Sequence, residues 1–230
     1  MAAANKKGLV SVVIPVYNGE RFLAAAIESV VGQGPAVAEV IVVDDGSEDG
    51  SAGVAEGWGA PVRCIGVFHG GIGAARNAGI EAAGGSFVAF LDADDLWTEA
   101  RLAAQLATFA ADPGLDMVFG LAEQFRDDGL PVTGMQGPGP GPAIIAGAML
   151  IRAASLGRVG RFATGIRMGE FIDWYGRAKD LGVREALLPL LVIRRRIHGE
   201  NTGIREAANR VDYTRVLRAA LERRRAAGRE

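Results

Sequence analysis

The sequence predicts one α/β domain with a mixed, mainly parallel central sheet that is flanked by helices. The chain has 230 residues, which suits one large domain. Through its first half, apolar runs of strand length alternate with longer stretches of helical period, the pattern of βαβ units that feed a parallel sheet. No segment of about 20 to 50 residues repeats along the chain, so a single architecture assembled in sequence order is expected.

The elements of the first half follow from these runs. Apolar, β-branched-rich runs predict strands at residues 9–16, 37–43, 62–68, 86–91 and 116–122. Helical periodicity predicts helices at residues 20–31, 72–83 and 98–110. Asn18 is the expected cap of the first helix, and Thr98 is the expected cap of the third.

The pattern changes after Arg126. Gly and Pro dominate residues 129–142, and such a stretch is expected to hold neither a strand ladder nor a helix. We interpret it as an exposed loop, either a connector or a flap over a substrate. Beyond it the sequence predicts a short helix within 144–154, a helix at 169–181, one or two strands within 183–197 and an arginine-rich terminal helix at 205–225.

Composition excludes several classes of protein. The net charge of −2 gives no global positive field, so nucleic acid is not an expected partner. The single cysteine, Cys64, excludes disulfides within the chain and four-thiolate zinc sites. The residues before Leu9 are too few and too polar for a secretory signal, and no apolar run reaches the ~20 residues of a membrane-spanning helix. We therefore expect a cytoplasmic protein.

Polar residues gather at the ends of four predicted strands. In an open parallel sheet, ligands bind at the carboxyl ends of the strands, where loops and helix N-termini converge. The convergence of all four clusters predicts one ligand site. The clusters are Tyr17-Asn18, Asp44-Asp45-Gly46-Ser47, His69-Gly70-Gly71 leading to Arg76-Asn77, and Asp92-Ala93-Asp94-Asp95.

The acidic turn Asp92-Ala93-Asp94-Asp95 is the sharpest of these signals. Three carboxylates within four residues repel one another unless water, a cation or protonation relieves them. Mg²⁺ and Mn²⁺ prefer oxygen ligands and commonly bridge one or two carboxylates to substrate phosphates. The turn therefore predicts a divalent metal bound with a nucleotide-linked substrate. The alternative is an acidic helix N-terminus, where Asp94 or Asp95 complements the dipole of the following helix.

Four segments of the chain carry a resemblance to a known family. They are Val12-Val13-Ile14-Pro15-Val16-Tyr17-Asn18, Ile41-Val42-Val43-Asp44-Asp45-Gly46-Ser47, Ala75-Arg76-Asn77-Ala78-Gly79 and Phe90-Leu91-Asp92-Ala93-Asp94-Asp95. Together they resemble family 2 glycosyltransferases of the GT-A fold, which is Rossmann-like. The resemblance is dense over residues 9–97 and looser beyond. It implies one GT-A domain over residues 1–230, with a nucleotide-sugar-binding half (about 9–125), an acceptor half (about 143–203) and a C-terminal helical extension (about 204–230).

The resemblance also implies roles for individual residues in binding the donor. Asp44 would accept a hydrogen bond from a base N–H at the nucleobase and ribose, and Asp45 could share this role. Arg76 would lie near the base or the diphosphate as a planar cation. Asp94 would ligate Mn²⁺ or Mg²⁺, with Asp95 as a neighbouring acid. The donor-binding set is completed by Pro15, Tyr17, Asn18, Asp92 and Ala93. For each residue, the alternative is a hydrogen bond that only orders a loop.

The catalytic base is where the sequence departs from the family. Family members carry a Glu-Asp pair at the start of a later helix, and that aspartate deprotonates the acceptor; here Phe171 stands at its position. Glu170 and Asp173 are three residues apart and are expected on one helix face, so either could serve, with Glu170 preferred. A solvated helix N-terminus is the alternative. His198 resembles a histidine that ligates the metal or touches the diphosphate, and loop ordering is its alternative.

These observations predict a metal-dependent inverting glycosyltransferase that uses a UDP-sugar. The acceptor, whether sugar, lipid, peptide or small molecule, is not identified by the sequence. A nucleotidyltransferase would be expected to have a Gly-rich loop with a basic residue directly after the first strand, yet the first basic residue is Arg21. A nucleotide-sugar-binding or scaffold protein without turnover stays open because of Phe171. The terminal helix is expected to dock on the core, with contact to an anionic membrane surface as its alternative.

Overall fold

A nine-stranded mixed sheet forms the centre of the molecule. The computed structural model describes residues 9–128, 139–166, 168–199, 218, 222, 223 and 225. Along the sheet the strands run β3 (Val62–Gly66), β2 (Val37–Asp44), β1 (Val10–Val16), β4 (Phe87–Phe90), β8 (Leu150–Arg152), β6 (Met117–Phe125), β9 (Glu185–Arg196) and β5 (Leu96–Trp97), and β7 (Gly141–Ala143) pairs with β6. This arrangement confirms the predicted mixed α/β sheet.

The first half of the chain builds the parallel part of the sheet. β1 pairs in parallel with β2 and with β4, and β2 pairs in parallel with β3. Every residue of β1 is buried, because helices cover both faces of this part. Alternate residues of β1 face opposite layers: Val12 packs with α1 (Glu20–Val31) and α2 (Ser51–Glu56), whereas Val13 packs with α3 (Ile72–Ala82).

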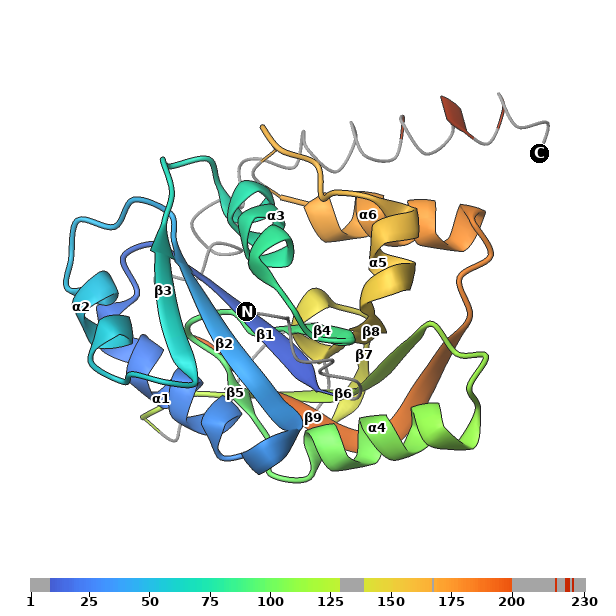
Figure 1. Cartoon of the computed structure of the whole chain (residues 1–230), viewed down its shortest axis with the longest axis horizontal. Coiled ribbons are helices and arrows are strands. Elements are labelled where there is room, and N and C mark those ends of the chain that lie inside the picture. The colour runs from blue at the N-terminus through green and yellow to red at the C-terminus, as the bar shows by residue number, and fades with distance from the viewer. Residues whose placement is uncertain are drawn as a thin grey trace, which may run out of the picture.

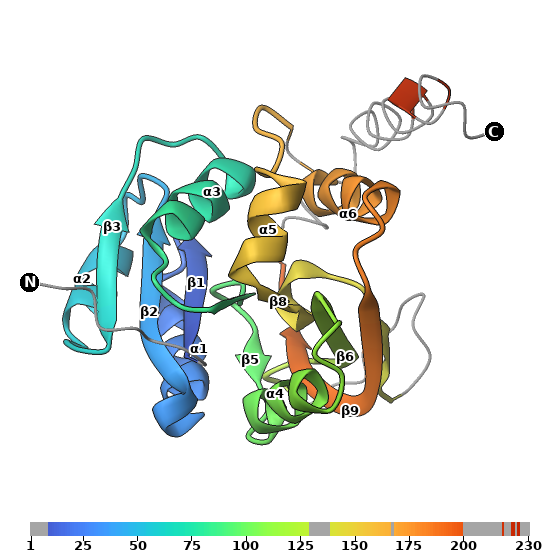
Figure 2. The same ribbon diagram turned by 45° about the vertical axis from the view of Figure 1, so that its right-hand side comes forward.

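The second half adds strands of both directions. β8 is antiparallel to β4 and β6, β9 is parallel to β6, and β5 is antiparallel to β9. Figures 1 and 2 show α5 (Ala153–Val159) and α6 (Glu170–Asp180) on the same side of the sheet as α3, with α1 and α4 (Arg101–Ala111) on the opposite side. Two short 3₁₀ turns, Gly34–Ala36 and Ala146–Ala148, complete the described elements. The result is three layers.

Two predicted helix caps are wrong because their side chains bind elsewhere. The residue that caps α1 is Gly19, and the Oδ1 atom of Asn18 accepts a hydrogen bond from the Glu48 N–H at 2.8 Å. Thr98 lies before the start of α4 at Arg101, and its hydroxyl donates to the Leu191 carbonyl at 2.6 Å. In both cases a polar side chain near a helix start joins two distant segments of the chain.

Several predicted boundaries also shift. The third strand ends at Gly66, and Phe68 beyond it is fully exposed. Pro142 lies in β7, so the predicted loop is wrong at its end. Among the described strands β7 pairs with β6 alone, and a proline is tolerated on such an edge strand. The short helix expected within 144–154 is a 3₁₀ turn followed by β8 and the start of α5. α2 was not predicted.

Two predicted segments lie wholly or mostly outside the described residues. Residues 129–138 of the Gly/Pro-rich stretch are not described, and of the terminal helix only residues 218, 222, 223 and 225 are, all four in helical conformation. Across the described residues, no helix has the length and apolar character needed to cross a membrane.

Candidate active site

The carboxyl ends of β1, β2 and β4 form one edge, here called the rim (residues 17–19, 44–47 and 92–95). The Asn18 N–H donates to the Ser47 hydroxyl at 2.9 Å, which joins the first loop to the second. A Cβ atom added to Gly19 would lie 3.5 Å from the Cβ of Ala93, which brings the first loop beside the acidic turn. The fourth cluster joins them, because Gly70 and Gly71 bind Asp45 and Arg76 binds Asp92. The structure therefore brings all four predicted clusters together, as their strand-end positions imply.

Asn18 and Asp44 order the backbone of the rim. Asn18 has a φ of 51°, a left-handed conformation that asparagine tolerates better than most residues. The Asp44 carboxylate accepts a hydrogen bond from the Ser47 N–H three residues along the chain, at 3.0 Å, which orders the loop after β2. Asp44 is only partly buried, so its carboxylate can order the loop and still face a ligand.

Asp45 has a different role from its neighbour. It is 3% exposed, and its two carboxylate oxygens accept hydrogen bonds from the N–H groups of Gly70 and Gly71 at 2.8 and 2.9 Å. His69 Nδ1 lies 3.1 Å from the same carboxylate. These contacts anchor the loop after β3 to the rim. Pro15 is likewise buried within β1, so it can border a ligand only through the shape of the strand end.

Tyr17 and His69 form an aromatic pair at the rim. Their ring centroids lie 4.2 Å apart with a tilt of 36°. Tyr17 is 47% exposed, and the His69 Nδ1 atom is held 2.9 Å from the Asp45 carbonyl oxygen. The sequence placed His69 in the third cluster but gave it no role. Its contact with Tyr17 depends on the loop after β3 folding back toward β1, which no local pattern indicates.

Asp94 and His198 meet although they are far apart in the sequence. His198 Nε2 lies 3.0 Å from an Asp94 carboxylate oxygen. His198 follows β9, and its ring packs on Phe22 with centroids 4.6 Å apart. Burial and the charge of Asp92 raise the pKa of Asp94, and the contact with His198 partly offsets this effect. The two residues that the resemblance assigns to the metal therefore lie in direct contact.

Asp95 is buried below the turn. It is 4% exposed and accepts a hydrogen bond from the Arg196 N–H at 2.9 Å. Burial, together with the charges of Asp94 and Asp92, raises its pKa well above the ordinary value. This hydrogen bond therefore joins the acidic turn to the end of β9.

Two side chains at the acidic turn can serve as protein ligands of a divalent ion. Asp94 and His198 offer one oxygen and one nitrogen that lie side by side, and both atom types suit Mn²⁺. Within the part of the chain that the structure describes, no group of three or more His, Cys, Asp or Glu side chains is arranged to hold a metal. An ion at this position would complete its coordination with phosphate oxygens and water, as Mg²⁺ commonly does.

Arg76 joins the rim to α6. It is buried, and its guanidinium donates to Asp92 Oδ1 at 2.8 Å through Nη2 and to Glu170 Oε1 through Nη1. Burial lowers the pKa of Arg76, but the two carboxylates outweigh this and raise it above its ordinary value. Asp92, one of the predicted donor-binding acids, is thus already paired with a cation from α3.

The two candidate bases on α6 have separate partners. Glu170 binds Arg76, whereas Asp173 lies 3.0 Å from Arg177 Nε and 2.9 Å from Arg223 Nη1. Their spacing of three residues does bring both to the start of the helix, but the structure places them in different ion-pair networks. Each carboxylate is therefore neutralised by arginine rather than held free.

Phe171 takes part in the hydrophobic core. It is 9% exposed, and its ring centroid lies 6.1 Å from those of Trp174 and Tyr175 and 6.4 Å from that of Phe119. The side chain that replaces the family's aspartate thus packs in an aromatic cluster, not in a polar site.

The start of α6 is also held against α3 by polar contacts. The Asn77 side chain exchanges two hydrogen bonds with the Phe162 backbone, at 2.9 and 2.8 Å. A Cβ atom on Gly73 would lie 2.2 Å from the Ala163 carbonyl oxygen, so only glycine allows this close approach. The Ala75-to-Gly79 segment therefore positions the loop that leads into Glu170.

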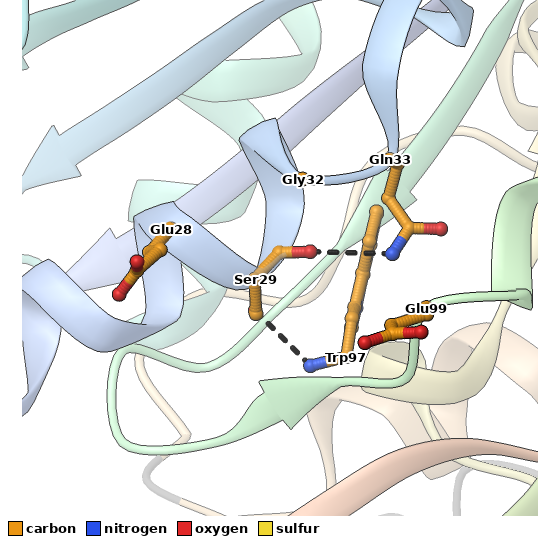
Figure 3. Close-up of a pocket in the computed structure, with 6 residues that line it drawn as sticks. All are labelled: Glu28, Ser29, Gly32, Gln33, Trp97 and Glu99. Carbon is orange, nitrogen blue, oxygen red and sulfur yellow. Dashed lines mark hydrogen bonds between the residues drawn. The ribbon is translucent and has the colours of Figure 1, made fainter.

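A separate pocket lies at the far end of α1. It has a volume of about 360 Å³, and Figure 3 shows its lining residues Glu28, Ser29, Gly32, Gln33, Trp97 and Glu99. α1 begins beside the rim and spans 12 residues, so its two ends are about 18 Å apart. None of the predicted site residues lines this pocket.

Comparison with known proteins identifies the family. The sequence model of glycosyl transferase family 2 matches residues 11–163, more than half of the chain. The putative glycosyltransferase EpsH of Bacillus subtilis is 38% identical over 123 residues, which cover 52% of this chain and 36% of EpsH. The putative teichuronic acid biosynthesis glycosyltransferase TuaG of the same organism is 38% identical over 106 residues, which cover 44% of this chain and 42% of TuaG. The chain thus spans well under half the length of these curated relatives.

Solved structures show the same fold. S. aureus TarS residues 1–349 superimpose with a TM-score of 0.68 and 22% identity over 92% of this chain and 64% of TarS. The TarS complex with UDP-GlcNAc gives a TM-score of 0.69 and 23% identity over 85% of this chain and 60% of that chain. With the family match over residues 11–163, the chain belongs to glycosyltransferase family 2 and has the GT-A fold.

Proposed function

We propose that this chain transfers a sugar from a UDP-sugar to an acceptor nucleophile, with inversion at the anomeric carbon. The observation that carries the proposal is the 3.0 Å contact between Asp94 and His198, residues of two distant segments that meet at the rim. The TarS structures with UDP-GlcNAc and with UDP support UDP as the nucleotide of the donor. The proposal therefore rests on a fold that binds such donors and on an acid–histidine pair suited to a diphosphate–metal complex.

The donor would lie along the rim. The exposed Tyr17 ring, backed by His69, offers a flat surface for the nucleobase, and Asp44 offers an acceptor for its N–H. Arg76, which is buried and paired with Asp92 and Glu170 in this structure, has a planar guanidinium of the kind that binds phosphate oxygens in pairs. With the nucleobase at Tyr17 and the diphosphate near Arg76, the sugar of the donor would lie toward the start of α6.

Asp94 and His198 are the residues that would hold Mn²⁺ or Mg²⁺. Such an ion supplies charge stabilisation to a departing diphosphate when it is bound. His198 is fixed by its packing on Phe22, so the imidazole is already oriented toward Asp94 in this structure.

The transfer itself would be a single displacement. The acceptor hydroxyl oxygen forms a bond to the anomeric carbon from the face opposite the diphosphate, and the bond from that carbon to the diphosphate oxygen breaks, with its electron pair leaving on the diphosphate. The hydroxyl proton passes to a carboxylate on α6, either Glu170 or Asp173. Both lie in the first turn of that helix.

One observation favours a second candidate function. Phe171 is buried, and both carboxylates of the first turn of α6 are paired with arginines. A protein that binds the nucleotide-sugar without transferring it would have the same rim and no need for a free base.

Donor hydrolysis and donor binding separate the two functions. UDP binding that depends on Mn²⁺ and is lost in Asp94→Asn is expected from both. Turnover of a UDP-sugar, to free sugar or to an acceptor, is expected only from the enzyme and should fall by at least about 100-fold in Asp94→Asn. The matched control is Asp112→Asn, which removes an exposed carboxylate paired with Arg184. Binding without turnover across a broad acceptor panel would reject the catalytic proposal.

A further inference from the structure

Arg76 connects two parts of the site that meet only through tertiary structure. It lies on α3, whereas Asp92 follows β4 and Glu170 begins α6. Its side chain is 4% exposed, and both terminal nitrogens are occupied by carboxylates. Its Nε atom is buried and has no hydrogen-bond partner among the described residues. The Nε–H of the guanidinium is therefore unsatisfied by the described residues, while each terminal nitrogen donates one hydrogen bond to a carboxylate.

The charges around Arg76 are unbalanced. One guanidinium faces two carboxylates, and the Glu170 side chain is only 10% exposed, so little water screens the contact. A diphosphate oxygen pair would offer the fork at least as much negative charge in a matching planar geometry. Glu170 and a bound diphosphate would therefore compete for the same donor.

We propose that Arg76 changes partners when the donor binds: it holds Glu170 in the donor-free protein and transfers to the diphosphate in the complex, which releases the Glu170 carboxylate toward the acceptor. This inference rests on the proposed function, because it requires a nucleoside diphosphate at the rim. Arg76 is then a positioning residue that makes the candidate base available only after the donor is in place.

The exchange has a measurable consequence for affinity. A ligand that must displace an internal partner binds with an apparent affinity that scales with the fraction of molecules in which that partner is not engaged. Removing the charge of Glu170 should therefore strengthen UDP binding, even though it removes a candidate base. If Glu170 only contacted the acceptor, removing its charge would leave the affinity for UDP unchanged. If it only supported the fold, removing its charge would lower that affinity.

The experiment measures the Kd of UDP with Mn²⁺ by calorimetry for the full chain and its variants. Glu170→Gln is expected to lower the Kd by about fivefold or more, a coupling typical of linked binding events, and to reduce turnover. Glu81→Gln is the matched control, because Glu81 lies on the same helix as Arg76 and pairs with a different arginine, Arg161. Its Kd should stay within about twofold of the original.

A second variant keeps the test informative if Glu170→Gln does not fold. Glu170→Asp retains the charge but shortens the side chain by one methylene, so it should loosen the pair with Arg76 and lower the Kd in the same direction by a smaller factor. In an Arg76→Lys background the fork is lost, and the effect of Glu170→Gln on the Kd should shrink.

The outcomes distinguish this inference from the function on which it rests. Failure of the unaltered chain to bind UDP with Mn²⁺ would reject both. Binding by the unaltered chain together with an unchanged or higher Kd in Glu170→Gln would reject only the partner exchange. A lower Kd in Glu170→Gln but not in Glu81→Gln would support it.

Discussion

Replacing Gly73 by alanine should loosen the contact between α3 and the segment that leads into α6. The added Cβ would lie 2.2 Å from the Ala163 carbonyl oxygen and 3.3 Å from its carbonyl carbon. These are backbone atoms, so the conflict cannot be relieved by turning a side chain. The helix must move away from the segment, and the pairing of Arg76 with Glu170 depends on their closeness.

The size of the effect follows from two opposing terms. Overpacking a close contact costs about 1–3 kcal/mol, whereas alanine in place of glycine inside a helix gains up to about 1 kcal/mol. The free energy of unfolding should therefore fall by about 1–2 kcal/mol, which is about 2–8 °C in Tm for a domain of this size.

Thermal unfolding followed by circular dichroism measures this change, with Gly53→Ala as the matched control. Gly53 lies inside α2, and its added Cβ would meet nothing within 4 Å, so this variant should be as stable as the original or more stable. A Gly73→Ala protein with the Tm of Gly53→Ala would refute the close backbone approach between α3 and the loop before α6.

Three further changes test other parts of the structure. Burial raises the pKa of Asp116, but the Ser155 and Arg184 hydrogen bonds outweigh it and hold this pKa below its ordinary value; the stabilisation is present above that value and lost as pH falls. Asp116→Asn should thus lower Tm at pH 7, and in a pH series of melts the difference should shrink from about pH 4 downward and vanish as pH falls through the lowered pKa of Asp116. Phe171→Asp should cost about 3 kcal/mol or more and should not raise turnover, because it places a carboxylate in an aromatic cluster; an unchanged Tm together with faster donor hydrolysis would contradict this. Asp45→Ala should free the loop after β3 and increase its proteolysis rate, and an unchanged rate would argue against its anchoring role.

The order of elements in the first half was largely predictable from sequence. The helix expected at residues 20–31 forms over that span, and the strand ends carry the polar clusters to one rim. Both outcomes follow from local rules: the period of apolar residues sets the element, and parallel strands share one carboxyl edge. The family assignment rests on the same clusters, which is why it was visible before the structure.

The partners of polar side chains near these elements were not predictable in the same way. Asn18 and Thr98 have the right types for helix caps, yet each binds a segment tens of residues away. Asp44 and Asp45 are adjacent and chemically identical, yet only Asp45 is enclosed by backbone N–H groups of another loop. A short polar side chain has several possible partners of similar strength, and packing selects among them.

By itself, the sequence determined the α/β architecture, the rim and the family, because each depends on residue type and short-range spacing. Only the tertiary structure decided that His198 reaches Asp94, that Arg76 bridges Asp92 and Glu170, and that Asp173 belongs to a separate arginine network. The physical reason is the range of the interactions. The apolar periodicity that sets helices and strands involves residues a few positions apart. A buried charge, in contrast, is paired with a residue that can be distant in the sequence, since leaving the charge unpaired costs several kcal/mol.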